Sequence, residues 1–193
     1  MLCPTLTVAP VEKPIALNMT KAHARIDHDD DDIYVEGLID AAIARVDGYT
    51  GILGRCMITQ TWSQTFPKWG TGLRLSLPDV QSVVLKYRDD NDDEQTIPSY
   101  HYEIVEDAQS AVVIYRDAFV TPSLNSDRYA PVAAEMTAGY GDQPDDVPAA
   151  IRHALYMLVG HWYENRETVA GGAMTTVPES TEALLAPYRR IGV

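Results

Sequence analysis

The chain has 193 residues, of which 46% are hydrophobic and 22% charged, and its formal net charge is −13. This length suits one domain, or one domain with a sizeable insertion, and it is enough to bury a substantial core. So acidic a chain excludes a broad basic surface for nucleic acid, and it disfavours contact with anionic membranes.

The cysteines and the first residues indicate a protein of the reducing cytoplasm. Cys3 and Cys56 are too few for a disulfide framework or a zinc site. The opening MLCPTLTVAPVEKP lacks the basic segment and the continuous apolar core of a signal peptide. No apolar run reaches the roughly 18 residues that a membrane span needs.

The first third of the chain predicts an arm and two helices. Three prolines within residues 1–17 predict an extended arm that is ordered only against a neighbour. A short helix is expected from Thr20, followed by a solvated acidic link at residues 28–32 that also favours a helix start. A second, amphipathic helix should then run to about Tyr49, because apolar residues repeat at three and four.

After Arg55 the apolar period changes from helical to alternating. The alternation within residues 56–141 predicts six or seven antiparallel strands. The run Asp89–Asp93 is rich in turn-forming residues and predicts a hairpin loop, and residues 119–129 predict a longer loop.

The last third predicts one long helix and a short one. Residues 147–169 form a candidate amphipathic helix, with Pro148 at its first position and Asp145 and Asp146 satisfying the first turn. Gly171 and Gly172 should end it. A linker and a short helix within 179–190, capped by Ser180 or Thr181, complete the chain.

These elements define an α+β fold in a single domain of residues 1–193. We expect a helical core from residues 18–55 and 145–170, an inserted antiparallel β unit at 56–141, and a C-terminal docking arm at 173–193.

Candidate chemistry is sparse. Asp27, Asp29 and Asp31 have the alternate spacing of a calcium loop, but the required glycine and the final glutamate are absent, so a solvated link is favoured. His153 and His161 are eight residues apart, whereas a helical metal pair needs three or four. No nucleophile elbow or phosphate-binding glycine loop is present. We therefore expect no catalytic residues, no metal, no cofactor and no enzymatic activity.

Two clusters instead indicate contact with other proteins, because Trp, Tyr and Arg are enriched at interface hot spots. The alternative for each cluster is a helix end with ordinary surface ion pairs. The candidate interface residues are Trp162, Tyr163, Arg166, Glu167, Leu184, Leu185, Tyr188, Arg189 and Arg190.

At this point the chain resembles the head–tail connector (adaptor) proteins of tailed bacteriophages and gene transfer agents. The resemblance is carried by the order and spacing of several segments. These are LIDAAIARVDGYTG (38–51), MITQTWSQTF (57–66), LRLSLPDVQSVVLKYRDD (73–90), TAGYGD (137–142), VPAAIRHALYMLVGHWYENRE (147–167) and VPESTEALLAPYRR (177–190).

The resemblance implies a helical connector core with a β insertion and a structural role. Such adaptors form a ring, usually dodecameric, beneath the portal protein, which joins the DNA-filled head to the tail and extends the DNA channel. It implies portal docking through residues 179–193, contacts between copies through the central helices, and a stopper or tail-completion partner. DNA would pass without sequence-specific binding, along a wall whose acidity repels it. The protein would lie in the bacterial cytoplasm during assembly and then in the particle neck, with no membrane contact.

Two alternatives remain open from the sequence. One is a stopper or tail-completion protein of the same neck. The other is a ligand- or carbohydrate-binding β module, motivated by Trp62, Trp69, Tyr100 and Tyr102. Exposed aromatic rings in a concave patch would favour the second alternative, and buried rings would exclude it.

Overall fold

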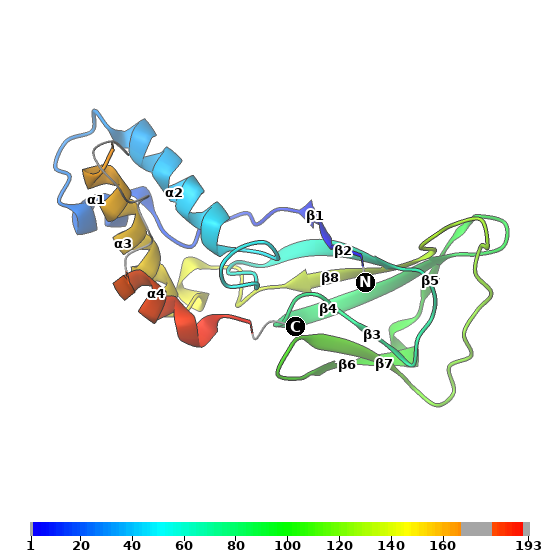
Figure 1. Cartoon of the computed structure of the whole chain (residues 1–193). Coiled ribbons are helices and arrows are strands. Elements are labelled where there is room, and N and C mark those ends of the chain that lie inside the picture. The colour runs from blue at the N-terminus through cyan, green and yellow to red at the C-terminus, as the bar shows by residue number, and fades with distance from the viewer. Residues whose placement is uncertain (1, 167–178, 191–193) are drawn as a thin grey trace, which may run out of the picture. The chain divides into compact units, whose positions relative to one another are not determined.

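The computed structural model of the chain describes residues 2–166 and 179–190. Its helices and two antiparallel sheets confirm the α+β class that the sequence predicts (Figure 1). The structure divides into two compact units. The β unit takes its chain from residues 1–10, 59–140 and 190–193, and the helical unit takes its chain from residues 11–58 and 141–189.

The helical unit is organised around α3 (Ala149–Glu164), which packs against the other three helices. These are α1 (Leu17–Ala24), α2 (Asp32–Val46) and α4 (Glu179–Leu185), and short 3-10 turns occupy Pro144–Asp146 and Ala186–Tyr188. The apolar positions at helical spacing bury one face of each long helix. The core residues of α2 and α3 are Val35, Ile39, Ala42, Val46, Ile151, Ala154, Leu155, Leu158 and Val159.

The start of α3 differs from the sequence prediction. Pro148 precedes the helix, and its carbonyl accepts hydrogen bonds from the N–H groups of Ile151 and Arg152. Asp146 instead accepts the N–H of Gln143 at 2.9 Å, and Asp145 pairs with Arg152 at 2.6 Å. Asp146 therefore caps the preceding 3-10 turn, and Asp145 forms an ion pair with a side chain of α3. Neither aspartate accepts an N–H of the first turn of α3, because both lie in the 3-10 turn ahead of the helix. At its other end α3 stops at Glu164, and the predicted residues 167–169 lie outside the described part.

The end of α2 comes at Val46, before the predicted Tyr49. Asp47 leaves the helix, and its Oδ1 accepts the N–H of Met57 at 2.6 Å. Gly51 sits so close to this turn that a Cβ there would lie 2.2 Å from the Asp47 carbonyl oxygen. Only glycine fits at position 51, where the chain turns back toward the end of α2.

The β unit contains a five-stranded sheet and a three-stranded sheet. The larger has the order β1 (Thr5–Val8), β2 (Gln60–Phe66), β8 (Val132–Ala138), β4 (Val80–Arg88) and β5 (Glu94–Ile97). The smaller has the order β3 (Gly72–Arg74), β7 (Ala111–Tyr115) and β6 (Tyr102–Glu106), with a 3-10 turn at Ser99–His101. The seven strands β2–β8 agree with the six or seven that alternation predicts.

The register of the larger sheet follows from side-chain alternation. On β8, Val132, Ala134 and Met136 are fully buried, whereas the residues between them are partly exposed. Met136 is paired with Trp62 on one side and with Val83 on the other. A slip by one residue would turn every apolar side chain of β8 outward, so this alternation fixes the pairing.

Two buried polar side chains join the sheets within the β unit. Gln64 on β2 donates to the carbonyl of Arg74 on β3 at 3.4 Å and accepts the N–H of Ser76, just after β3, at 2.8 Å. Tyr102 on β6 donates its hydroxyl hydrogen to the carbonyl of Val83 on β4 at 2.8 Å. Burial raises the pKa of the Tyr102 phenol, which keeps that donor protonated. Because an unpaired buried polar group is costly, these bonds specify how the two sheets face each other.

The N-terminal residues form a strand within their own chain. The sequence predicts an arm ordered only against a neighbour, but Thr5–Val8 pairs along β2 as the edge of the larger sheet. No helix of the described residues is long and apolar enough to cross a membrane.

Candidate functional site

The first predicted interface cluster lies at the C-terminal end of α3. Trp162 and Tyr163 are half-buried and Arg166 is exposed, whereas Glu167 lies outside the described residues. Arg166 extends over two rings, with its guanidinium carbon 4.6 Å from the ring centroids of both Tyr34 and Tyr163. Arg166 therefore makes cation–π contacts with two aromatic rings.

Asp31, just before α2, completes this cluster. Its Oδ2 accepts the Tyr163 hydroxyl at 2.6 Å and the Arg166 guanidinium at 2.5 Å. The cluster therefore ties the end of α3 to the start of α2, which are distant in sequence. Tyr163 and Arg166 thus have partners within the chain, and sequence reasoning missed Asp31 because it was assigned to a solvated link.

The same contacts set the ionisation of the cluster. The Tyr163 hydroxyl, followed by the Arg166 guanidinium, holds the pKa of Asp31 below its ordinary value of 3.8. The hydrogen bond to Asp31 raises the pKa of Tyr163. A carboxylate with a lowered pKa stabilises the fold above its unfolded pKa, and it loses that contribution as the pH falls through its folded pKa.

We expect Asp31→Asn to lower the melting temperature of the protein near neutral pH, and the difference from the wild type to shrink as the solution is acidified below 3.8. Thermal unfolding at a series of pH values measures this. Asp30→Asn is the matched control, because Asp30 is exposed and should change little. A difference between wild type and Asp31→Asn that is constant with pH would contradict the ion-pair assignment.

The second predicted cluster lies on and after α4. Leu184, Tyr188 and Arg189 are half-buried, and Arg189 pairs with Glu182 at 3.5 Å. The Arg190 guanidinium donates a hydrogen bond to the Ser76 carbonyl inside the β unit.

Leu185 differs from the other candidate residues of this cluster. It is fully buried, and α4 packs on α3 within the helical unit, so Leu185 is a core residue in this structure. Thr181 is also fully buried inside α4, so it does not cap that helix. Both residues lie on the inward face of a helix that the sequence assigned to a docking arm.

The acidic link between α1 and α2 is more ordered than predicted. Lys21 on α1 contacts Asp29 at 2.6 Å and Asp32 at 2.5 Å. These two carboxylates raise the pKa of Lys21, chiefly through the hydrogen bond to Asp29. Within residues 2–166 and 179–190, no group of three or more His, Cys, Asp or Glu is arranged to hold a metal ion.

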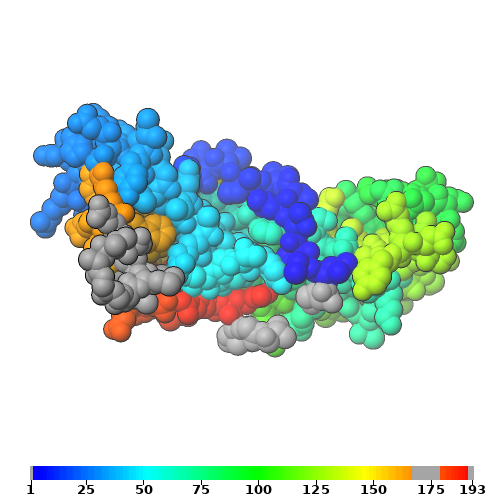
Figure 2. Space-filling model, turned by 45° about the horizontal axis from the view of Figure 1, so that its top comes forward, coloured from blue at the N-terminus to red at the C-terminus, as the bar shows by residue number. Residues whose placement is uncertain are grey.

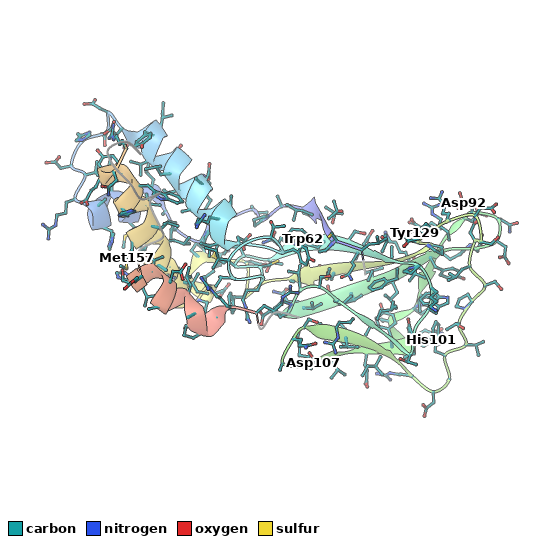
Figure 3. The ribbon with its side chains drawn as sticks, viewed as in Figure 1. Trp62, Asp92, His101, Asp107, Tyr129 and Met157 are labelled. Atoms are coloured by element: carbon teal, nitrogen blue, oxygen red, sulfur yellow. The ribbon has the colours of Figure 1, made fainter. Side chains whose placement is uncertain are left out.

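Most of the aromatic residues that motivated a ligand-binding module are buried or contact other residues of the chain. Tyr102 is buried, and Trp62 on β2 is half-buried with its indole N–H on Gln60 (Figure 3). Trp69 packs edge-on against Tyr115 and Phe119. Of the four rings, only Tyr100 is largely exposed, at 68%. They therefore form no shared binding face.

Trp69 belongs to a set of anchors that sequence reasoning missed. Its indole N–H donates to the Pro122 carbonyl at 3.0 Å, which fixes the long loop between β7 and β8. Asp92 in the β4–β5 turn holds the same loop, because Arg128 donates to both of its oxygens (Figure 3). Asn125 in the same loop donates its backbone N–H to the Arg88 carbonyl at 3.0 Å. The loop is therefore attached at Trp69, at Asp92 and at Arg88, and it presents Val120 and Tyr129, which are 84% and 80% exposed.

A further feature is the outer face of α2. Ile33 is 88% exposed, and Gly37, Ala41 and Ala44 are exposed along the same face. A surface helix normally carries polar residues there. Glycine inside a helix costs about 1 kcal/mol relative to alanine, and a Cβ at Gly37 would meet no atom within 4 Å. Packing within the chain thus gives no reason for glycine at this position.

Part of the chain matches a known protein family. Residues 14–68, which span α1, α2 and β2, match the family model described as phage gp6-like head–tail connector protein. No curated protein sequence matches the chain. The resemblance to head–tail connector proteins that the sequence indicates is therefore confirmed.

Solved structures agree on the fold over the whole chain. A chain from the neck of an empty gene transfer agent particle, computed with C6 symmetry, superposes with a TM-score of 0.78 at 21% identity, covering 100% of this chain and 97% of that one. A chain from the virion of a native gene transfer agent particle gives 0.77 at 20% identity, with the same coverage. A chain from a native particle neck with C12 symmetry gives 0.65 at 19% identity, covering 97% of each.

Proposed function

We propose that this protein is a structural adaptor of a phage or gene transfer agent neck. It forms a ring beneath the portal protein, joins the DNA-filled head to the tail and extends the DNA channel. The observation that carries the proposal is the connector family match over residues 14–68, within a fold that superposes along its length on particle neck chains. Its partners are the portal, a stopper or tail-completion protein and further copies of itself, and its role involves no catalysis.

The outer face of α2 supports self-association. Burying Ile33 against a neighbouring copy would remove one of the most exposed apolar side chains of the described residues from water. Gly37 and Ala41 are four residues apart, and small side chains at that spacing let a partner approach the helix closely. We place the contact between adjacent copies at this face. The similar neck structures were computed with C6 and C12 symmetry, which supports an assembly of repeated copies.

The charge of the chain supports passage of DNA. Each copy has a net charge of −13. We propose that the ring turns part of this negative charge toward its opening. A duplex with one phosphate charge per roughly 1.7 Å is repelled by such a wall and slides without sticking to it.

We expect Gly37→Leu to abolish ring formation and to leave the monomer folded. The leucine meets no atom of its own chain, but it occupies the space that a neighbour needs. Gel filtration and electron microscopy of the protein bound to portal particles measure assembly, and circular dichroism measures folding. Ala22→Leu, at an exposed position of α1, is the matched control.

Complete rings formed by Gly37→Leu would exclude this face as the subunit contact. Electron microscopy of particle necks also separates the adaptor from the stopper. An adaptor ring touches the portal, whereas density for this chain only on the tail side would assign it as a stopper or tail-completion protein.

A further inference from the structure

Strand β1 is attached to the β unit through its backbone more than through its side chains. All four of its residues are exposed, and β2 is the strand with which it pairs. The pairing places Thr5 opposite Ser63 and Leu6 opposite Trp62, and the register shifts before Val8 meets Thr61. The side chains of β1 therefore contribute little to the core. The strand is held to β2 mainly by backbone hydrogen bonds.

The segment that follows β1 has the properties of a hinge. Residues 1–10 belong to the β unit, whereas the chain from Val11 onward belongs to the helical unit. Between them Ala9 to Lys13 are mostly exposed, with Val11 at 94%, before Pro14 and Ile15 are buried in the helical unit. Figure 2 shows the N-terminal segment, in dark blue, at the surface of the molecule.

We infer that in the assembled ring β1 leaves its own sheet and pairs with β2 of an adjacent copy. This inference rests on the self-assembly proposed above and names a second contact within it. The occupant of the β2 edge is then the same four-residue strand from another copy. Every hydrogen bond lost in one sheet is remade in the next, so the exchange needs no new surface, as in domain swapping.

Two observations favour exchange. Moving β1 uncovers little hydrophobic core, because the four side chains of the strand are already exposed and Pro4, just before it, is the buried residue that moves with it. Moving β1 also leaves the edge of β2 open beside the half-buried Trp62, and an unpaired edge of this kind is a template for another strand. In a closed ring each copy donates one strand and receives one, so no edge stays unpaired.

A disulfide across the pairing distinguishes the two states. Thr5→Cys and Ser63→Cys place two thiols at facing positions, in a Cys3→Ser background that removes the nearby exposed thiol. Oxidation of the isolated monomer should give an intrachain bond, and non-reducing gel electrophoresis should show one band at monomer mass. Oxidation of rings assembled on portal particles should give a ladder of covalently linked copies. The single cysteine variants are the controls, and they should give no ladder.

The outcomes separate this inference from the function on which it rests. Rings that contain only intrachain-linked monomers overturn strand exchange and retain the adaptor. Failure of the parent protein to form rings overturns both. Should the Thr5→Cys/Ser63→Cys protein not fold, Val8→Cys with Thr61→Cys tests the same exchange at the other end of the strand.

Discussion

Leu185→Ala should destabilise the helical unit by roughly 2–5 kcal/mol, the range for truncation of a buried leucine that leaves a cavity. Leu185 is fully buried where α4 packs on α3. Loss of this side chain removes apolar contacts that the surrounding helices cannot fully replace. Urea unfolding followed by far-ultraviolet circular dichroism measures the change.

Leu184→Ala is the matched control for this experiment. Leu184 is the adjacent residue on the same helix and is half-buried, so the same change should cost clearly less. Trp162 fluorescence reports on the helical unit once Trp62 and Trp69 of the β unit are replaced by phenylalanine. Equal and small effects at both leucines would show that α4 is a detachable arm, as the sequence suggested, and not part of the core.

Trp69→Ala should destabilise the β unit by about 3 kcal/mol, the lower end of the range for buried aromatic residues, because Trp69 is only half-buried. The substitution removes edge-on ring contacts to Tyr87, Tyr115 and Phe119, together with the hydrogen bond to Pro122. The loop between β7 and β8 then loses its attachment at Trp69 and keeps those at Asp92 and Arg88.

Limited proteolysis measures the release of this loop. Cleavage within residues 117–129 should be faster in Trp69→Ala than in the wild type, at protease concentrations that leave the wild type intact. Trp69→Phe is the control, because it keeps most of the ring contacts and loses the hydrogen bond, worth about 0.5–1.5 kcal/mol. Cleavage at the wild-type rate in Trp69→Ala would show that Asp92 and Arg128 hold the loop without it.

Periodicity predicted the elements well, because it reports which side chains are removed from water. The buried faces of α2 and α3 follow the helical spacing of Val35, Ile39, Ile151 and Leu155. Alternation likewise predicted the strands within residues 56–141, and β8 buries every second residue. Helix ends were less accurate, since they depend on particular contacts such as Asp47 with Met57, which spacing does not reveal.

The candidate site was harder to predict because its contacts are long-range. Asp31 lies in a run of aspartates, and nothing in that run distinguishes it from its neighbours until folding brings Tyr163 and Arg166 to it. Likewise, β1 has the composition of an arm, and only its partner β2 makes it a strand. The outer face of α2 did carry a signal, since Ile33, Gly37, Ala41 and Ala44 recur at helical spacing along one side of the helix, where Asp40 is a neighbouring charged residue.

The division of the chain has a mechanical consequence. The backbone passes between the β unit and the helical unit at residues 10–11, 58–59, 140–141 and 189–190. A force that pulls the two units apart is therefore shared among four covalent connections. One of them leads into β1, whereas two others lead into β2 and β8, which are paired with each other along their full length. Under tension β1, which has four residues and one neighbouring strand, should detach before the β2–β8 pair separates.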